Sequence, residues 1–349
     1  MLQCPGCSAT MPRKLPGTTI HCPDCAKELT VPDDDHVLAA GTMLGAFEIL
    51  DLIGTGGMGH VYLARDTATD RQVALKVLAN VFCDDATMRR RFLNEMRLLA
   101  ALEHPNIVTV FGAGEDGSHT FLSMAFVKGV ALDERLEEVG QPLEEAEVLR
   151  IAAEIAKGLD YAFRKKGILH RDIKPANVML AKNQVKILDL GIARRATRRT
   201  DVTEKGLAIG TPQYMSPEQA MAKEVDCRSD MYALGVTMYH LLTGRCPHDG
   251  GSPAEVMTRV VSDDLPPIRT IRPDLSIGCE RFLQQITARP PEARHDSWRE
   301  VRIELERIRT QQVAEVPDSA DSAPPARLGL VITGLLLLTL ALYAASRLL

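Results

Sequence analysis

The 349-residue sequence lacks several features that would assign it to a common functional class. It has no excess of positive charge, because its formal net charge is −5, so non-specific binding to nucleic acid is not expected. It has no internal repeat at the periods typical of solenoid proteins. Its N-terminus is polar and cysteine-rich and lacks the charged start and apolar run of a signal peptide. With 45% hydrophobic and 25% charged residues, the composition is that of an ordinary globular protein.

Composition changes along the chain divide it into five segments. Residues 311–327 are rich in Pro, Ala, Ser and Asp and are expected to form a flexible linker. The predicted order is a small cysteine-bearing module (1–30), a polar connector (31–43), a folded unit with both strands and helices (44–310), the linker (311–327) and an apolar segment (328–346).

The stretch LIGTGGMGHVY contains Gly54, Gly56 and Gly59 in the spacing G-x-G-x-x-G. This spacing occurs in the helix-opening turn of Rossmann folds and in a phosphate-covering loop between two strands, and alone it also fits a plain flexible turn. The flanking segments AFEILDLI and HVYLA are rich in β-branched and aromatic residues, and residues 60–72 show no helical periodicity. The sequence therefore predicts a β-hairpin followed by a third strand, RQVALKVL.

A lysine and a glutamate downstream have the arrangement that a phosphate site requires. Lys76 lies in the predicted third strand, and Glu95 lies in MRRRFLNEMRLLAAL, whose apolar residues recur at helical spacing. A lysine that holds phosphate oxygens needs an anionic partner to orient it. Taken alone, Lys76 and Glu95 could equally form an ordinary surface pair.

The segment ILHRDIKPANVML (168–180) resembles the catalytic loop of protein kinases, with the Lys-Pro pair of the serine/threonine class. The resemblance implies that Asp172 accepts the proton of the substrate hydroxyl and that Lys174 neutralises phosphoryl charge. It also implies that Asn177 and Asp189, the latter in KILDLGIA, hold Mg²⁺ or Mn²⁺. The expected fold is an α+β bilobal kinase, with a β-rich N-lobe and a mainly α-helical C-lobe. The expected reaction transfers the γ-phosphoryl group of ATP to serine or threonine hydroxyls of proteins.

The same resemblance extends over about residues 44–310 and defines an ATP site between the lobes. Val61 and Ala74 would cover the purine, Met179 would lie beneath it, and Met124 would be the gatekeeper beside the hinge. The full set of expected nucleotide-binding residues is Ile53, Gly54, Thr55, Gly56, Gly57, Met58, Gly59, His60, Val61, Ala74, Lys76, Met124, Ala125, Val127, Asn177, Met179 and Asp189.

Motifs after the catalytic loop are similar to those of eukaryote-like bacterial kinases. GTPQYMSPEQA places Thr211 where the family favours serine and threonine acceptors, and Asp230 is expected to support the catalytic loop. Arg294 is expected to pair with Glu218. Three departures are Leu190 for an aromatic residue, S-P-E for A-P-E, and Ala125 for an acidic hinge residue, and none of them removes a group that the chemistry needs.

The activation loop ARRATRRTDVTEKGLAIGT offers three threonines before the GT motif. The family uses an arginine such as Arg171 to bind a phosphate on this loop, and Thr203 matches the usual position best, with Thr197 and Thr200 nearby. The basic RRATRR run either binds that phosphate or is a solvated charge run. Autophosphorylation in trans is the hypothesis, and a homodimer is one arrangement that would allow it.

Four cysteines near the N-terminus follow the spacing C-x₂-C-x₁₄-C-x₂-C. Cys4, Cys7, Cys22 and Cys25 match a structural Zn²⁺ site close to the zinc-ribbon pattern. Two disulfides are the alternative, but an ATP-using domain implies a reducing compartment.

The apolar segment 328–346 has 19 uncharged residues, about 28 Å as a helix, which matches the hydrocarbon thickness of a membrane. The expectation is therefore a single-pass C-terminal anchor in the cell membrane, with the kinase and zinc modules in the cytoplasm. Protein substrates and the bilayer are the expected partners. The alternatives are a catalytically weak pseudokinase scaffold and a zinc-ribbon binding protein with a regulatory kinase domain.

Overall fold

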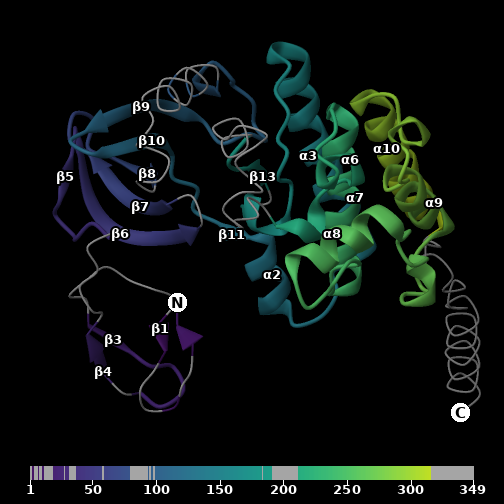
Figure 1. Ribbon diagram of the computed structural model, residues 1–349, viewed down its shortest axis with the longest axis horizontal. Helices are drawn as coiled ribbons and strands as arrows, with labels where there is room; N and C mark the ends of the chain where they lie inside the picture. The colour runs from purple at the N-terminus through teal and green to yellow at the C-terminus, as the bar shows by residue number, and fades with distance from the viewer. Residues whose placement is uncertain are drawn as a thin grey trace, which may run out of the picture. The chain divides into compact units, whose positions relative to one another are not determined.

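A computed structural model describes residues 2–3, 7, 10–11, 19–26, 28–30, 37–56, 59–78, 93, 96, 99–182, 184–190 and 211–315 (Figure 1). The chain separates into two units between Arg309 and Thr310. Among the described residues, none of the helices is both long enough and apolar enough to cross a membrane. The predicted membrane segment 328–346 lies outside the described residues.

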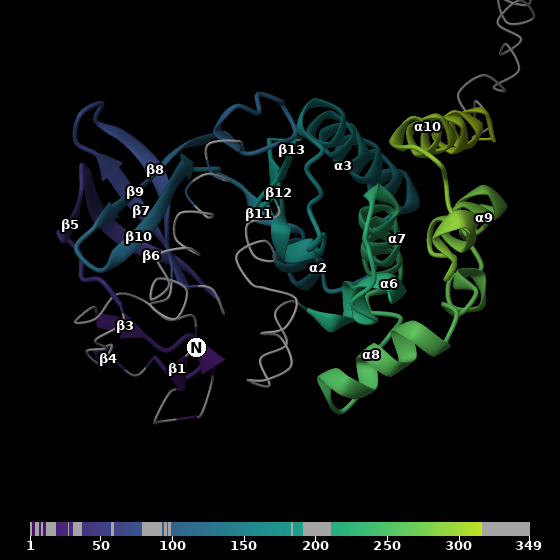
Figure 2. The same ribbon diagram turned by 45° about the horizontal axis from the view of Figure 1, so that its top comes forward.

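The N-lobe is a curled antiparallel sheet of six strands in the order β5-β6-β7-β8-β10-β9 (Figures 1 and 2). Its strands are β5 (Met43–Leu44), β6 (Phe47–Gly56), β7 (Gly59–Asp66), β8 (Arg71–Leu78), β9 (Val110–Asp116) and β10 (His119–Ala125). Ile49, Tyr62, Leu75 and Phe121 form the core on one face of this sheet. Val37 joins that core, so the lobe includes residues before β5.

The glycine-rich segment forms the predicted hairpin. Gly54 and Gly56 end β6, Gly59 begins β7, and Gly56 is paired with Gly59 across the turn. Gly59 has a φ of 131°, which a residue with a side chain rarely adopts. The hairpin prediction is confirmed, and the helix-opening turn of a Rossmann fold is excluded.

The C-lobe is mainly helical and is built around α7 (Cys227–Thr243). Nearly every residue of α7 is buried, as expected for a helix enclosed by other elements on all sides. Among the described residues of this lobe, the other α-helices are α2 (Leu132–Val139), α3 (Glu145–Lys166), α6 (Pro217–Ala220), α8 (Pro253–Ser262), α9 (Ile277–Ile286) and α10 (Trp298–Glu315). A small sheet of β11 (Val130–Ala131), β12 (Val178–Ala181) and β13 (Gln184–Ile187) completes the lobe.

The N-terminal module contains two short antiparallel pairs of strands. β1 (Leu2–Gln3) pairs with β2 (Thr10–Met11), and β3 (Thr19–His21) pairs with β4 (Glu28–Thr30). Two hairpins of this size bury too little apolar surface to be stable on their own.

Replacing Gly235 by alanine is expected to lower the free energy of unfolding by about 1 to 3 kcal/mol. A Cβ at Gly235 on α7 would lie 2.6 Å from Ile286 Cγ2 and also against Thr287, so α7 and α9 would have to separate. Urea unfolding followed by the fluorescence of Trp298, the only tryptophan and a buried residue, measures the change. The control is Gly112→Ala, whose methyl group would meet nothing within 4 Å. Equal stability of the two variants would contradict the prediction.

Candidate active site

The catalytic loop is held in place by a buried carboxylate on α7. Asp230 Oδ2 accepts a hydrogen bond from His170 N at 2.7 Å, and Oδ1 accepts one from Arg171 N at 2.6 Å. Burial raises the pKa of Asp230, while His170 and the two backbone amides partly oppose that rise. The predicted support of the loop by Asp230 is therefore present.

His170 links the catalytic loop to the segment before Asp189. Its Nε2 lies 2.8 Å from the carbonyl oxygen of Leu188, and its Nδ1 accepts a bond from Asp172 N at 3.3 Å. These partners place the ring proton on Nε2. Arg171 and Asp189 have φ values of 67° and 52°, a conformation that costs energy for residues with a side chain and is found mainly at functional sites.

Asp172 lies within a cluster of polar groups formed by residues of the catalytic loop and Thr211. Asn177 Nδ2 donates to the Asp172 backbone oxygen at 2.7 Å and to its Oδ2 at 2.9 Å. Lys174 Nζ lies 3.0 Å from Asp172 Oδ2 and donates to Thr211 Oγ1 at 2.8 Å. The arrangement fixes a carboxylate beside a cation and a hydroxyl, which suits the orientation and deprotonation of another hydroxyl.

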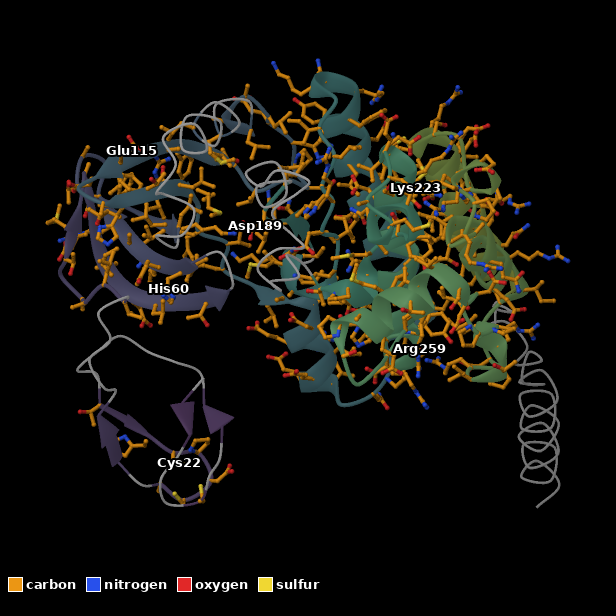
Figure 3. The ribbon with its side chains drawn as sticks, in the orientation of Figure 1. Cys22, His60, Glu115, Asp189, Lys223 and Arg259 are labelled. Atoms are coloured by element: carbon orange, nitrogen blue, oxygen red, sulfur yellow. The ribbon has the colours of Figure 1, made fainter. Side chains whose placement is uncertain are left out.

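Lys76 forms an ion pair with Asp189 across the two lobes. The distance from Lys76 Nζ to Asp189 Oδ2 is 2.6 Å, and Asp189 lies between the sheet and the helical lobe (Figure 3). Burial raises the pKa of Asp189, but Lys76, His170 and Lys174 together outweigh burial and leave the pKa below its ordinary value. The expected partner of Lys76, Glu95, lies outside the described residues.

One face of the N-lobe sheet presents four of the predicted nucleotide-binding residues together. Val61 is paired with Lys76, and Ala74 is paired with Met124, so the four side chains share one face. The Ala125 amide donates a hydrogen bond to the Thr109 carbonyl oxygen at 2.8 Å.

The remaining predicted nucleotide-binding residues are spread over both lobes. Ile53 is exposed, and His60, Val127 and Met179 are partly buried. Gly57 and Met58 lie outside the described residues. The described members come from β6, β7, β8, β10, the segment after β10, the short 3-10 helix Pro175–Asn177, β12 and the loop before Leu190, so both lobes contribute to the set.

An apolar pocket lies behind Met124. Leu99, Val110, Leu122, Met124 and Leu190 are among its lining residues, and Asp189 is a polar residue in the lining. Leu190, where the family resemblance leads one to expect an aromatic residue, is itself buried and belongs to the main core. The substitution therefore keeps this position apolar and enclosed.

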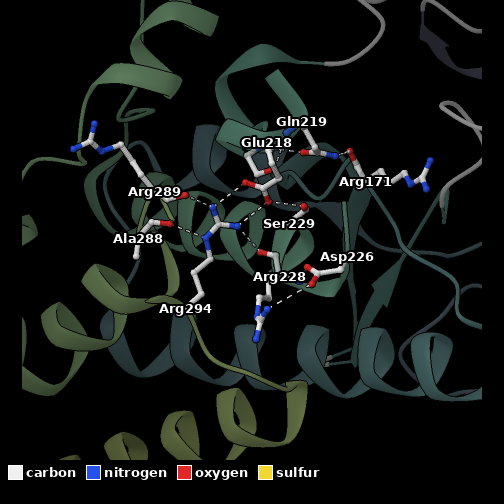
Figure 4. Close-up of polar contacts among 10 residues, drawn as sticks. Arg171, Glu218, Gln219, Asp226, Arg228, Ser229, Ala288, Arg289 and Arg294 are labelled. Carbon is white, nitrogen blue, oxygen red and sulfur yellow. Dashed lines mark hydrogen bonds and ion pairs between the residues drawn. The ribbon is translucent and has the colours of Figure 1, made fainter. Parts of the chain in front are cut away.

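Glu218 and Arg294 form the predicted ion pair (Figure 4). Arg294 Nη1 and Nη2 donate to Glu218 Oε1 and Oε2 at 2.8 and 2.9 Å. The other guanidinium hydrogens bond to the carbonyl oxygens of Ala288, Arg228 and Arg289. Burial raises the pKa of Glu218, but Arg294 and Ser229 outweigh it, so the pKa lies below its ordinary value. The pair is fully satisfied, as a buried charge requires.

Gln219 is a positioning residue that the sequence analysis missed. Its Nε2 donates to the Arg171 carbonyl oxygen at 3.2 Å, and its Oε1 accepts from Ser216 N at 3.0 Å (Figure 4). Ser216 Oγ in turn accepts from Gln219 N, which completes a capping box at the start of α6. The signal was present in the sequence as S-P-E-Q, the S-x-x-Q pattern of such a box.

Tyr232 and His248 extend the network around Arg294. The Arg294 guanidinium carbon lies 4.9 Å from the Tyr232 ring centroid, and the Tyr232 hydroxyl lies 3.2 Å from His248 Nε2. Burial lowers the pKa of His248. His248 is therefore neutral at pH 7 in the folded protein.

Three of the four predicted zinc ligands lie together in the N-terminal module. The sulfur atoms of Cys7, Cys22 and Cys25 are all within 4.8 Å of one another, and Cys7 Sγ lies 3.5 Å from Cys22 Sγ. A disulfide would require about 2.05 Å. Cys4 lies outside the described residues.

Arg294→Ala is expected to lower the free energy of unfolding by about 3 to 5 kcal/mol, because it leaves the Glu218 carboxylate buried without its cation. Urea unfolding monitored by Trp298 fluorescence measures the loss. Arg259→Ala is the matched control, because Arg259 pairs with Glu255 in an exposed position and its loss should cost about 0.5 kcal/mol or less. A loss for Arg294→Ala no larger than that of the control would refute the prediction.

Lowering the pH from 7 to 5 is expected to reduce the free energy of unfolding. The unfolded chain binds a proton at His248 with a pKa of about 6.5, whereas burial lowers that pKa in the folded chain. Between these two pKa values the unfolded chain binds more protons than the folded chain. The free energy of unfolding therefore decreases as the pH falls from the unfolded pKa toward the lower folded pKa. His248→Gln should flatten this dependence, measured as urea unfolding at a series of pH values. A variant with the slope of the wild type would show that His248 is not responsible.

Comparison with known proteins identifies the family. The family model described as "Protein kinase domain" matches residues 47–302. The serine/threonine-protein kinase PknB of Mycobacterium leprae is 38% identical over 276 residues, which are 78% of this chain and 44% of that protein. The serine/threonine-protein kinase pkn2 of Myxococcus xanthus is 39% identical over 264 residues, 72% of this chain and 31% of that protein.

A solved structure supports the same assignment. The Mycobacterium tuberculosis PknI kinase domain is 31% identical, with a TM-score of 0.63, and the match covers 78% of this chain and 99% of that domain. This chain spans less than half the length of the two relatives named above. The matched region contains the interlobe site, the Asp172 cluster and the Glu218–Arg294 pair, and this chain belongs to the protein kinase family.

Proposed function

We propose that the protein is a serine/threonine kinase that transfers the γ-phosphoryl group of ATP to hydroxyl groups of proteins. The observation that carries the proposal is the cluster of Asp172, Lys174 and Thr211, joined by contacts of 3.0 and 2.8 Å. Relatives at 38 and 39% identity are named serine/threonine-protein kinases. In this proposal Asp172 is the base for the substrate hydroxyl, Lys174 supplies positive charge beside it, and Thr211 helps to position it.

Asp172 is the proposed acceptor of the substrate proton. Asn177 holds the carboxylate in one orientation through its bond to Oδ2, so Asp172 does not have to be ordered when the substrate arrives. Lys174, bonded to both Asp172 and Thr211, brings its positive charge to the side from which the hydroxyl approaches. A serine or threonine hydroxyl fits beside Thr211, whose own hydroxyl is fixed by Lys174.

Lys76 is the proposed cation for the phosphates of ATP, with the adenine lying against Val61, Ala74 and Met124. The donor set suits a hard cation, because Asp189 is ionised at neutral pH and the Asn177 amide nitrogen is turned toward Asp172. Mg²⁺ or Mn²⁺ held by Asn177 and Asp189 would neutralise phosphate oxygens during transfer.

Autophosphorylation is the proposed mode of activation. The sites would be Thr203 and its neighbours Thr197 and Thr200, which lie outside the described residues, and Arg171 would bind the resulting phosphate. Transfer in trans would need two copies of the chain in contact. A pseudokinase scaffold is the alternative, and the intact Lys76, Asp172 and Asp189 argue against it.

A structural Zn²⁺ in the N-terminal module is proposed from its cysteines. Tetrahedral coordination by thiolates at about 2.3 Å puts the sulfur atoms about 3.8 Å apart, close to the 3.5 Å between Cys7 and Cys22. Cys25 would be the third ligand and Cys4 the fourth. Metal binding would supply the stability that two short hairpins lack.

A single-pass anchor over residues 328–346 is proposed from the sequence, preceded by the modules predicted over 1–30, 31–43, 44–310 and 311–327. Two of these bounds change, because Val37 packs in the N-lobe core and α10 continues to Glu315, so the folded unit extends beyond 44–310 at both ends. The segment 328–346 carries 19 uncharged residues. The kinase and zinc modules would lie in the cytoplasm, because the reaction needs ATP and the zinc site needs reduced thiols.

Asp172→Asn is expected to reduce phosphoryl transfer by about a hundredfold or more, because the amide cannot accept the substrate proton. The full chain with MgATP is assayed for phosphate incorporation, with mapping of the modified residues. ATP binding by the variant, measured by calorimetry, should match the wild type. Thr211→Ser, which keeps the hydroxyl that Lys174 contacts, is the conservative control and should remain active. A wild type that binds ATP but transfers no phosphate would favour the scaffold.

The purified chain is expected to contain about one equivalent of zinc, measured by elemental analysis. Cys22→Ser should lose the metal, because one of four thiolates is removed. Cys279→Ser should keep it, because Cys279 is buried in α9 and burial raises the pKa of its thiol. Equal zinc in the two variants would refute the site.

A further inference from the structure

A strongly basic surface lies on the C-lobe, on elements that the proposed reaction does not use. It comprises Lys157 and Arg164 on one side of α3, Lys165 and Lys166 at the end of that helix, Lys186 of β13 and Arg302 of α10, and is called here the α3 basic face. Lys157, Arg164, Lys165 and Lys166 are exposed, and Lys186 and Arg302 are partly exposed.

Three cations of the α3 basic face lie near a pair of stacked rings. Lys157, Tyr161 and Arg164 follow one another at helical spacing and therefore share a side of α3. The His104 ring stacks on Tyr161 with centroids 5.0 Å apart. Burial lowers the pKa of His104, and Lys186, Arg302 and Lys157 lower it further, so all three cations lie near this ring.

The buried and partly buried carboxylates near this face already have partners. Asp160 is shared by Arg164 and Arg302, each at 3.0 Å. Glu154 accepts bonds from Asn106 Nδ2 and Val185 N at 3.0 and 3.2 Å. Glu103 adds one exposed carboxylate beside His104.

Positive charge therefore remains in excess on the α3 basic face. Within the part of the chain that the structure describes, Lys157, Lys165, Lys166 and Lys186 take part in none of the ion pairs. The overall charge of the chain is −5, so this excess is local. A local excess of this kind attracts an anionic surface over about a Debye length.

An aromatic side chain accompanies the cations. Phe163 is 36% exposed and directly precedes Arg164, Lys165 and Lys166 at the end of α3. Phe163 and Lys166 lie three positions apart on α3 and therefore share one side at the end of this helix, where an aromatic ring and a cation are exposed together.

We propose that the α3 basic face contacts the anionic headgroups of the membrane in which the chain is anchored. The proposal rests on the proposed anchor over 328–346. Residues 316–327 separate that segment from the end of α10, and an extended chain of this length spans at most about 40 Å. The kinase would therefore remain near the bilayer surface, where each basic residue contributes to its electrostatic attraction to anionic lipid headgroups.

The contact is tested by lysine footprinting of the full chain. Vesicles of phosphatidylcholine alone, or with about a third phosphatidylglycerol, are added, and acetylation rates of individual lysines are measured by mass spectrometry. We expect Lys157, Lys165 and Lys166 to be acetylated several-fold more slowly with anionic vesicles, and the protection to disappear at 0.5 M salt. Lys223, exposed near α6, is the internal control and should not change (Figure 3).

A charge-reversed variant tests whether these lysines cause the contact. Lys157→Glu, Lys165→Glu and Lys166→Glu together should lower the ratio of binding to anionic and neutral vesicles by about tenfold or more. The matched variant reverses Lys223, Arg245 and Arg281, which are exposed on other elements, and should keep the ratio. Autophosphorylation of both variants shows that the kinase fold is intact.

The measurements distinguish a failure of this proposal from a failure of the proposed anchor or of the proposed kinase activity. Flotation with neutral vesicles reports the anchor, and phosphate incorporation reports the kinase, so either can fail while the footprint still gives a result. Equal acetylation with both vesicles, or an unchanged ratio in the charge-reversed variant, overturns the proposal. Protection of the same lysines by a 20-base-pair DNA duplex without lipid, exceeding that by anionic vesicles, would assign the face to nucleic acid instead.

Discussion

The active site depends on one buried carboxylate, Asp230. A charge enclosed in the protein interior is costly unless hydrogen bonds satisfy it, and the two amides that do so here belong to His170 and Arg171. Because α7 is buried on nearly every side, Asp230 has no freedom to follow the loop. The loop must therefore adopt the conformation that the carboxylate sets, including the left-handed Arg171, and Asp172 takes its place from there.

The same helix also orders the substrate side of the site. Ser229, next to Asp230, donates to Glu218, and Glu218 is held by Arg294 from beyond α9. Gln219 then returns to the Arg171 carbonyl, so the segment around α6 and the catalytic loop are fixed to each other as well as to α7. A disturbance of the Glu218–Arg294 pair would consequently reach the catalytic loop at the Arg171 carbonyl through the neighbouring Gln219.

Parts of this arrangement could be predicted from the sequence, namely those that follow from local strand or helix patterns or from the order of motifs along the chain. The hairpin at Gly54–Gly59 followed from strand-forming neighbours on both sides, and the Glu218–Arg294 pair followed from the family resemblance. The contact of Lys76 with Asp189 was not predicted, because it joins two lobes 113 positions apart. The left-handed φ of Asp189 has no local signal either, since tertiary contacts impose it. The sequence indicated Gln219 only as part of a helix cap. Its hydrogen bond to the Arg171 carbonyl oxygen could be recognised only in the folded structure.

The Lys76–Asp189 contact also determines what a nucleotide meets on entering between the lobes. The two opposite charges neutralise each other at 2.6 Å, so the protein carries no isolated buried charge there. A triphosphate with its cation would replace one ion pair by two, phosphate with lysine and metal with carboxylate. Binding is then an exchange of counter-ions at nearly constant net charge, which spares the protein the desolvation of a lone lysine or a lone aspartate.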